Sequence, residues 1–221
     1  MRLLSLLFRR ARDPERVARR QAFDEIYSGK HWGEGESVSG AGSGIERTLL
    51  FRADLEGLLR ELNVRTLLDA GCGDFKWLPT FNLHDIRIIA IDVVPDLILA
   101  NQKRHPQTEF VVADFVSDGL PKSNLILCRD GLVHLSDADV VRALGNFRRS
   151  GAKWLLTNTF LDHKNSADIR TGEWRPLNLE RPPFSLPPPS RLIDERCFGY
   201  EGAYRDKRLA LWSSDDLPAA R

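Results

Sequence analysis

Leu67-Leu68-Asp69-Ala70-Gly71-Cys72-Gly73-Asp74 is the stretch of sequence that predicts the fold of this chain. An apolar run ends in an acid and then in a turn with two glycines, as in a strand that leads into a ligand-binding turn. Glycine has no Cβ, so a nucleotide can lie against the backbone of such a turn. A second apolar run, residues 88–91, ends at Asp92, twenty-one residues after Gly71. This spacing suits a carboxylate that accepts hydrogen bonds from both ribose hydroxyls, so the two runs predict a nucleoside-binding α/β domain.

A missing glycine indicates which nucleoside is bound. A dinucleotide turn has a third glycine, which lets the helix N-terminus approach a pyrophosphate. Lys76 occupies that position here, and Asp74, directly after the second glycine, would repel a pyrophosphate. An acid-x-Gly-x-Gly turn flanked by aspartates suits a ligand that carries a cationic amino group and no phosphate. S-adenosylmethionine has this chemistry.

At these residues the chain resembles the class I S-adenosylmethionine-dependent methyltransferases. Residues 67–73 match the first motif of that family and residues 88–92 the second, and the resemblance continues through residues 111–114 and 125–130. It implies a Rossmann-like α/β fold with a seven-stranded sheet, mostly parallel with its last strand antiparallel, and helices on both faces. It also implies S-adenosyl-L-methionine as the cofactor and methyl transfer as the activity.

The resemblance further implies a set of cofactor contacts near the strand ends. In that family an acid after the third strand accepts a hydrogen bond from the adenine amino group, and an apolar side chain lies against the ring. Asp114 and Phe115 fit this pattern, with a solvated loop aspartate as the alternative. A glycine-rich segment such as residues 28–44 often covers the methionine end, although its composition also fits a flexible linker. The expected cofactor-binding residues are Asp69, Gly71, Cys72, Gly73, Asp92, Val93, Asp114, Phe115, Arg129, Trp32, Ser39 and Gly40.

The fourth predicted strand, residues 125–128, provides the candidate catalytic groups. In open α/β sheets ligands lie outside the carboxyl ends of the central strands, so Asp130 and His134 are the best-placed titratable residues. His134 is a candidate general base because imidazole titrates near neutrality. The alternative is a histidine that is structural or only lines the cofactor pocket.

Length and composition predict a single methyltransferase domain over residues 1–221. The formal charge is +1, so no strongly charged partner is indicated, and nucleic acid is not expected. Three dispersed cysteines without a CxxC pair predict a reducing, cytoplasmic location and no metal site. No Asn-Pro-Pro-Tyr signature follows residue 128, which also argues against amino-methylation of nucleic-acid bases.

Residues 1–44 are predicted to form an N-terminal helix and a cofactor-covering loop. The apolar stretch at residues 1–8 is too short to span a bilayer, so stable membrane insertion is not expected. Seven arginines in the first twenty residues leave two interpretations open. The segment is either a solvated helix resting on the domain or a helix at a membrane surface.

Hydrophobic periodicity predicts the remaining elements. A capping box from Ser43 to Glu46 predicts a helix over residues 45–62, whose apolar positions should be core. Further helices are predicted from Pro95 to Arg104 and after Ser136. The predicted strands are residues 64–69, 87–92, 109–112, 125–128, 154–157, 191–198 and 206–213.

Residues 160–190 form a proline-rich loop without a convincing period, containing six of the twelve prolines. The loop leaves the carboxyl end of the fifth strand, so it is predicted to lie over the methyl acceptor. Its Trp174, Arg175, Asn178 and Phe184 are candidate acceptor-binding residues. The charges of the loop nearly cancel, and the expected acceptor is a small molecule or a glycan.

Two alternatives come from other functional classes. One is an NAD(P)-dependent oxidoreductase, which Lys76 and Asp74 disfavour. The other is a non-catalytic adenosyl-binding module on the same fold, against which the intact acids Asp69, Asp92 and Asp114 argue.

Overall fold

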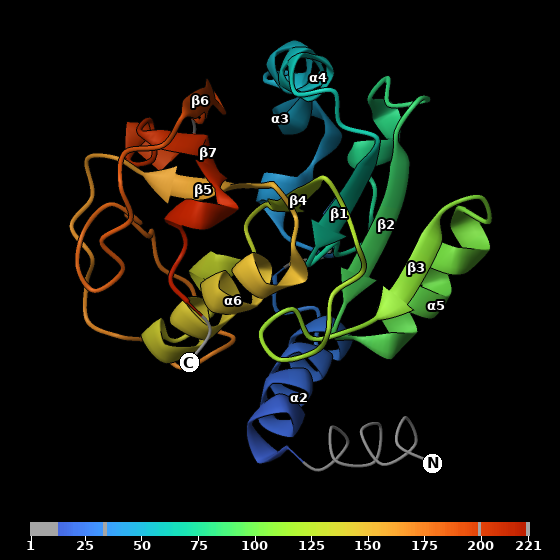
Figure 1. Ribbon diagram of the computed structural model, residues 1–221. Helices are drawn as coiled ribbons and strands as arrows, with labels where there is room; N and C mark the ends of the chain where they lie inside the picture. The colour runs from blue at the N-terminus through green and yellow to red at the C-terminus, as the bar shows by residue number, and fades with distance from the viewer. Residues whose placement is uncertain (1–12, 33–34, 199, 220–221) are drawn as a thin grey trace.

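The structure is a computed structural model that describes residues 13–32, 35–198 and 200–219 (Figure 1). Its strands form a seven-stranded sheet in the order β3-β2-β1-β4-β5-β7-β6. Strands β1 to β5 pair in parallel, and β7 is antiparallel to both of its neighbours. The predicted fold class is therefore confirmed. The strands are β1 (Thr66–Ala70), β2 (Arg87–Asp92), β3 (Glu109–Val112), β4 (Leu125–Cys128), β5 (Trp154–Phe160), β6 (Arg191–Asp194) and β7 (Lys207–Ser213).

Helices cover both faces of the sheet, because the central strands are apolar on both sides. Alternate residues of β1 pack into two different clusters: Leu68 lies with helix α6 (Asp137–Ser150), and Leu67 lies with helices α4 (Arg52–Glu61) and α5 (Pro95–Arg104). All four residues of β4 are buried. Helix α2 (Pro14–Ser28) lies at the edge where β1 and β2 end (Figure 1). That edge is where ligands bind in open α/β sheets.

Two of the predicted helix starts are confirmed. The side chain of Ser136 accepts a hydrogen bond from the backbone N–H of Asp139, so it caps α6. Pro95 is the first residue of α5, where its missing N–H leaves no helical hydrogen bond unmade.

The helix predicted over residues 45–62 is wrong as one element. It is divided into α3 (Ile45–Leu49) and α4, because Phe51 has φ −114° and ψ 5° and leaves the helical path. The Phe51 ring is fully buried and packs edge-to-face on Trp77 and Phe81, with centroid distances of 5.9 and 6.0 Å. Tertiary packing of one aromatic ring therefore overrides the local helical period.

The predicted start and core face of this helix also need correction. Gly44, not Ser43, is the N-cap residue of α3. Glycine has no side chain, so the N-cap residue itself makes no side-chain hydrogen bond to the first turn. Glu36 supplies the cap instead, because its carboxylate accepts a hydrogen bond from the backbone N–H of Ile45 at 3.1 Å. Leu49 is 41% exposed, whereas Leu55, Leu58 and Leu59 are buried as predicted.

The strand boundaries differ from the predictions mainly at the carboxyl edge. Strand β5 continues to Phe160 because residues 158–160 pair with residues 207–209 of β7. Strand β6 ends at Asp194 rather than at residue 198. As a result, the start of β7 lies beside the end of β5. Glu195, just after β6, contacts Asn158 of β5.

The proline-rich loop is packed against the domain over much of its length. Leu177, Leu179 and Leu186 are buried in the same cluster as α6. The backbone N–H of Phe160 donates to Leu177 O at 2.8 Å, and that of Leu186 donates to Leu179 O at 2.9 Å. The loop has no helix or strand of its own, but its backbone has partners in the fold.

Residues 1–12 of the predicted N-terminal helix lie outside the described residues, whereas its following part belongs to α2. Within the described ranges, no helix has the length and apolar character needed to cross a bilayer.

Candidate functional site

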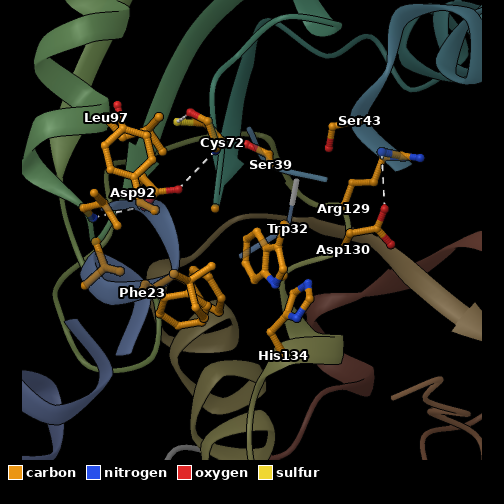
Figure 2. Close-up of a pocket in the computed structure, with 18 of the residues that line it drawn as sticks. Phe23, Trp32, Ser39, Ser43, Cys72, Asp92, Leu97, Arg129, Asp130 and His134 are labelled. Atoms are coloured by element: carbon orange, nitrogen blue, oxygen red, sulfur yellow. Dashed lines mark hydrogen bonds and ion pairs between the residues drawn. The ribbon is translucent and has the colours of Figure 1, made fainter. Parts of the chain in front are cut away.

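A cavity lies at the carboxyl edge of the sheet, between the ends of β1, β2 and β4 and the inner face of α2 (Figure 2). All but one of the residues expected to bind the cofactor line it, and the exception is Gly40, which lines an adjoining cavity. Further residues outside the expected cofactor-binding set also line the cavity: Arg19, Phe23, Ile26, Tyr27, Val38, Ser43, Trp77, Val94, Leu97, Val116, Gly131 and Leu135.

The turn after β1 has a backbone conformation that favours glycine at two positions. Gly71 and Gly73 have φ of +79° and +56°, in the left-handed region that residues with a Cβ rarely adopt. A Cβ added at Gly73 would lie 2.2 Å from Ser39 Oγ. Ser39 Oγ accepts a hydrogen bond from the backbone N–H of Asp74 at 2.9 Å, and the Asp74 carboxylate accepts one from Val38 N at 3.1 Å. The loop before α3 is thus seated directly on the glycine turn.

The contact between the loop and the turn makes a testable prediction. Gly73→Ala should weaken S-adenosylhomocysteine affinity at least tenfold, because the new methyl displaces Ser39 and the left-handed backbone costs about 1–2 kcal/mol. The double variant Gly73→Ala/Ser39→Gly removes the colliding atoms and should recover part of the affinity in a calorimetric titration. A double variant no better than the single one would contradict this account.

Asp92 ends β2 and points its carboxylate at the turn (Figure 2). One oxygen accepts a hydrogen bond from Gly73 N at 3.1 Å, and the other accepts one from Val94 N at 3.0 Å. Burial raises the pKa of Asp92 above its ordinary value, although these backbone donors oppose the rise. Each carboxylate oxygen has a second lone pair, so the group can also accept from ligand hydroxyls in the cavity.

Asp69, the acid within β1, is buried near Asp92. Burial, followed by the negative charge of Asp92, raises the pKa of Asp69 to about 7, although Arg129 opposes the rise. Two neighbouring carboxylates with raised pKa values are stabilised by a cation placed between or beside them. The cavity therefore suits a ligand with an ammonium group.

Asp114 lines the cavity but is also the centre of a buried ion pair. Its carboxylate accepts from Arg19 of α2 at 2.8 Å, from Ser117 Oγ at 2.9 Å and from the backbone N–H of Val116 at 2.9 Å. The same Arg19 pairs with Asp139 at 2.9 Å. Asp114 therefore holds α2 over the cavity.

Phe115 and Cys72 form apolar parts of the wall. A Cβ added at Gly71 or at Gly131 would lie 3.3 Å from the Phe115 ring, so both glycines let the backbone approach this ring closely. Burial raises the pKa of the Cys72 thiol well above its ordinary value, so this cysteine is a neutral, apolar wall residue.

His134 lies at the end of the 3₁₀ helix η3 (Leu132–His134), and Trp32 stacks on it at 4.4 Å between ring centroids (Figure 2). Its Nδ1 is 2.9 Å from the carbonyl oxygen of Glu173. A carbonyl only accepts, so Nδ1 carries the hydrogen and Nε2 of the neutral ring keeps its lone pair. Burial lowers the pKa of His134, which favours this neutral form. His134 is therefore a fixed imidazole that can accept a proton at Nε2.

Asp130 belongs to a network of two carboxylates and two cationic side chains. Lys207 Nζ lies 2.7 Å from the Asp130 carboxylate and 3.3 Å from that of Glu195, and Arg129 lies 3.3 and 2.7 Å from the same two groups. Burial alone would raise the pKa of Asp130, but Lys207 and Arg129 lower it to about 2. A carboxylate with so low a pKa is a weak base, so its geometry suits ion pairing.

A second cavity adjoins the first and shares with it Trp32, Ser39, Arg129, Asp130 and His134. Its outer wall is aromatic: Trp174 and Phe160 pack edge-to-face against Tyr204, with centroid distances of 5.2 and 5.8 Å. Trp174 is 42% exposed, so its ring lies at the mouth. The shared wall places His134 between the two spaces.

The four candidate acceptor residues of the proline-rich loop lie in different surroundings. Trp174 lines the second cavity. Arg175 is buried, donates to Leu135 O at 3.0 Å and pairs with Asp137. Asn178 holds the loop by donating to Leu161 O, and Phe184 packs in the cluster of α6. The last three do not line either cavity and serve the packing of the loop.

Sequence reasoning missed Glu195 and Lys207, which line the second cavity, and Arg19, which lines the first. It also missed Asn158, which contacts Glu195 from behind the cavity lining. Asn158 accepts from the backbone N–H of Asp130 and donates to Glu195. The antiparallel direction of β7 could have indicated Lys207, since the first residue of such a strand lies beside the ends of the parallel ones. No local pattern indicates Arg19, because its partners are 95 and 120 residues away.

No protein-family model matches the chain, and no curated protein matches its sequence. Solved structures, in contrast, do match the fold of this chain. Magnesium protoporphyrin IX methyltransferase (ChlM) from Synechocystis PCC 6803, with bound S-adenosylmethionine, aligns over 90% of this chain and 96% of its own, with a TM-score of 0.59 and 11% identity. The same enzyme with S-adenosylhomocysteine aligns over 65% and 71%, with a TM-score of 0.51 and 15% identity.

N-methyltransferase NodS from Bradyrhizobium japonicum WM9 aligns over 50% of this chain with a TM-score of 0.41 and 20% identity, and the match spans 62% of NodS. The chain thus covers less than two thirds of this relative. The alignment with ChlM, which spans nearly the whole of both chains, establishes the architecture. The chain has the class I S-adenosylmethionine-dependent methyltransferase fold.

Proposed function

We propose that this protein is an S-adenosylmethionine-dependent methyltransferase. The single observation that carries the proposal is the pair of buried carboxylates, Asp69 and Asp92, on the glycine turn of the first cavity. A ligand with an ammonium group and a ribose satisfies both. The fold, and the S-adenosylmethionine and S-adenosylhomocysteine found in ChlM, support this choice of cofactor.

We assign the cofactor contacts as follows. Asp92 accepts from the ribose hydroxyls, Asp69 faces the ammonium group, and the Phe115 ring packs against the adenine. Asp114 lies near the adenine but its carboxylate is committed to Arg19 and α2. Trp32 and Ser39 close the methionine end beside the second cavity. The remaining wall contacts come from Gly71, Cys72, Gly73, Val93 and Arg129.

The second cavity is the proposed acceptor site. S-adenosylmethionine supplies an electrophilic methyl group on a sulfonium, and the protein has to align the acceptor and remove its proton. Neutral His134, fixed by Glu173 and Trp32, is the general base. Asp130 remains ionised through its ion pairs and stabilises the imidazolium that forms.

Calorimetry with the purified protein tests the cofactor. S-adenosylhomocysteine should bind and NADH should not, and the opposite result would favour an oxidoreductase. Turnover of a labelled methyl donor with a metabolite extract then separates an enzyme from a non-catalytic adenosyl-binding module. Binding without any labelled product in that extract would support the module.

Cofactor affinity should depend on pH through Asp69. The pKa of this carboxyl is raised to about 7 by burial and Asp92, so below pH 7 it is protonated and attracts no ammonium. We expect S-adenosylhomocysteine affinity to fall up to about tenfold per pH unit below 7 and to level off above it. Calorimetric titrations from pH 5.5 to 8 measure this, and Asp69→Asn should bind weakly with a flat profile. A wild-type profile equally flat would contradict the assignment.

A further inference from the structure

We propose that the second cavity takes an aromatic acceptor with a phenolic hydroxyl, which His134 deprotonates as the methyl group is transferred. This inference rests on the proposed function, since it concerns the acceptor of the same reaction. Three observations support it: the aromatic side chains in the wall of the cavity, the ion pairs that its carboxylates already make, and the position of His134.

The wall of the cavity suits a flat, apolar body. Phe160, Trp174 and Tyr204 contact one another edge-to-face within 5.2 to 6.3 Å, and Trp32 closes the inner side. Aromatic rings arranged in this way offer faces and edges to a further ring. Trp174 is 42% exposed at the mouth, so a bound ring would cover apolar surface that is now in contact with water.

The carboxylates that line the second cavity, and the cations beside them, already have ion-pair partners. Asp130 and Glu195 are paired with Lys207 and Arg129, and Arg196 pairs with Asp54 at 2.9 Å. A protonated amine needs an uncommitted carboxylate, and both carboxylates that line the cavity already have cations. A sugar needs partners for several hydroxyl groups. A phenol needs a single acceptor for its hydroxyl.

His134 provides that acceptor. Its Nε2 keeps the lone pair because Nδ1 donates to Glu173 O, and the ring lines both cavities. A neutral imidazole is matched better to a phenol, with a pKa of about 10, than to the far less acidic hydroxyl of an alcohol.

The transfer step balances as follows. The phenolic oxygen attacks the methyl carbon while its proton passes to His134 Nε2. The new O–C bond forms as the S–C bond breaks, and the electron pair of that bond stays on sulfur. The products are a methyl ether and the neutral thioether S-adenosylhomocysteine. The imidazolium, attracted by Asp130, then loses its proton to water.

The test compares three simple probes on the protein loaded with S-adenosylhomocysteine: p-cresol, 4-methylcyclohexanol and methyl β-D-glucopyranoside. Saturation-transfer NMR should show p-cresol binding about tenfold more tightly than its saturated analogue, because only the aromatic ring stacks. Trp174→Ala should abolish this preference, whereas Leu99→Ala, a change of an exposed residue on α5, should not. With S-adenosylmethionine, mass spectrometry should detect 4-methylanisole.

Equal affinity for p-cresol and 4-methylcyclohexanol, or methylation of the glycoside in place of the phenol, overturns the inference. Calorimetry of S-adenosylhomocysteine on the same sample separates this failure from failure of the proposed function. If the thioether binds and the phenol preference is absent, only the acceptor assignment is wrong. If the thioether does not bind, the proposed function itself is wrong.

Discussion

Asp92→Ala is expected to weaken the affinity for S-adenosylhomocysteine by at least about 100-fold. Hydrogen bonds to a charged group contribute about 1.5–3 kcal/mol each, and the carboxylate is placed to accept from the two ribose hydroxyls. The variant also removes the acceptor for the backbone N–H groups of Gly73 and Val94, so the turn loses its hydrogen-bonded support. Isothermal titration calorimetry measures the affinity, and circular dichroism shows whether the fold persists.

Asp96→Ala is the matched control. Asp96 lies four residues further along the chain, in the first turn of α5, and is exposed and outside the cavity. Its removal should leave the affinity within twofold of the natural protein. If Asp92→Ala binds as tightly as Asp96→Ala while both are folded, the ribose assignment and the cofactor site proposed from it fail.

Arg19→Met is expected to lower the free energy of unfolding by about 3–5 kcal/mol. Arg19 is 4% exposed and is paired with both Asp114 and Asp139, which are also buried. Methionine has a similar length but no charge, so the change leaves the buried carboxylate of Asp114 without the cation it pairs with. Asp139 keeps only the half-exposed Arg142, at 3.3 Å, among its ion-pair partners in the described residues. Urea denaturation followed by circular dichroism gives the free energy of unfolding.

Arg20→Met provides the comparison on the same helix. Arg20 pairs with Asp24 at 3.2 Å, but both side chains are at least 40% exposed, so the solvent screens the pair. We expect a change below about 0.5 kcal/mol. Similar losses in the two variants would show that the buried pairs do not anchor α2.

The apolar runs and their spacing along the sequence were sufficient to predict the strands of the sheet. Residues 87–92, 109–112 and 125–128 form β2, β3 and β4 with the boundaries predicted for them. Strand β4 is buried at every residue and is apolar throughout, and this constraint is visible in the sequence. For the same reason the acids at the strand ends, Asp69 and Asp92, were placed correctly at the edge of the sheet.

Local signals were less reliable where distant residues compete with them. Ser43 and Glu46 have the spacing of a capping box, yet Glu36 caps the helix from a preceding loop. The helical period through residues 45–62 is interrupted because burial of the Phe51 ring stabilises a different backbone. In both cases the partner that decides the conformation is brought in by the fold.

The sequence by itself determined the fold and the edge of the sheet at which a nucleoside would bind. It did so through the apolar runs, the glycine turn and the acids that end the strands, because these features act within a few residues. Only the tertiary structure placed Arg19 on Asp114, brought Lys207 and Glu195 together near Asp130, and placed Trp174 and His134 in the wall of one cavity. These residues are far apart in the chain, and the charge or ring that each one meets depends on how the strands and loops come together.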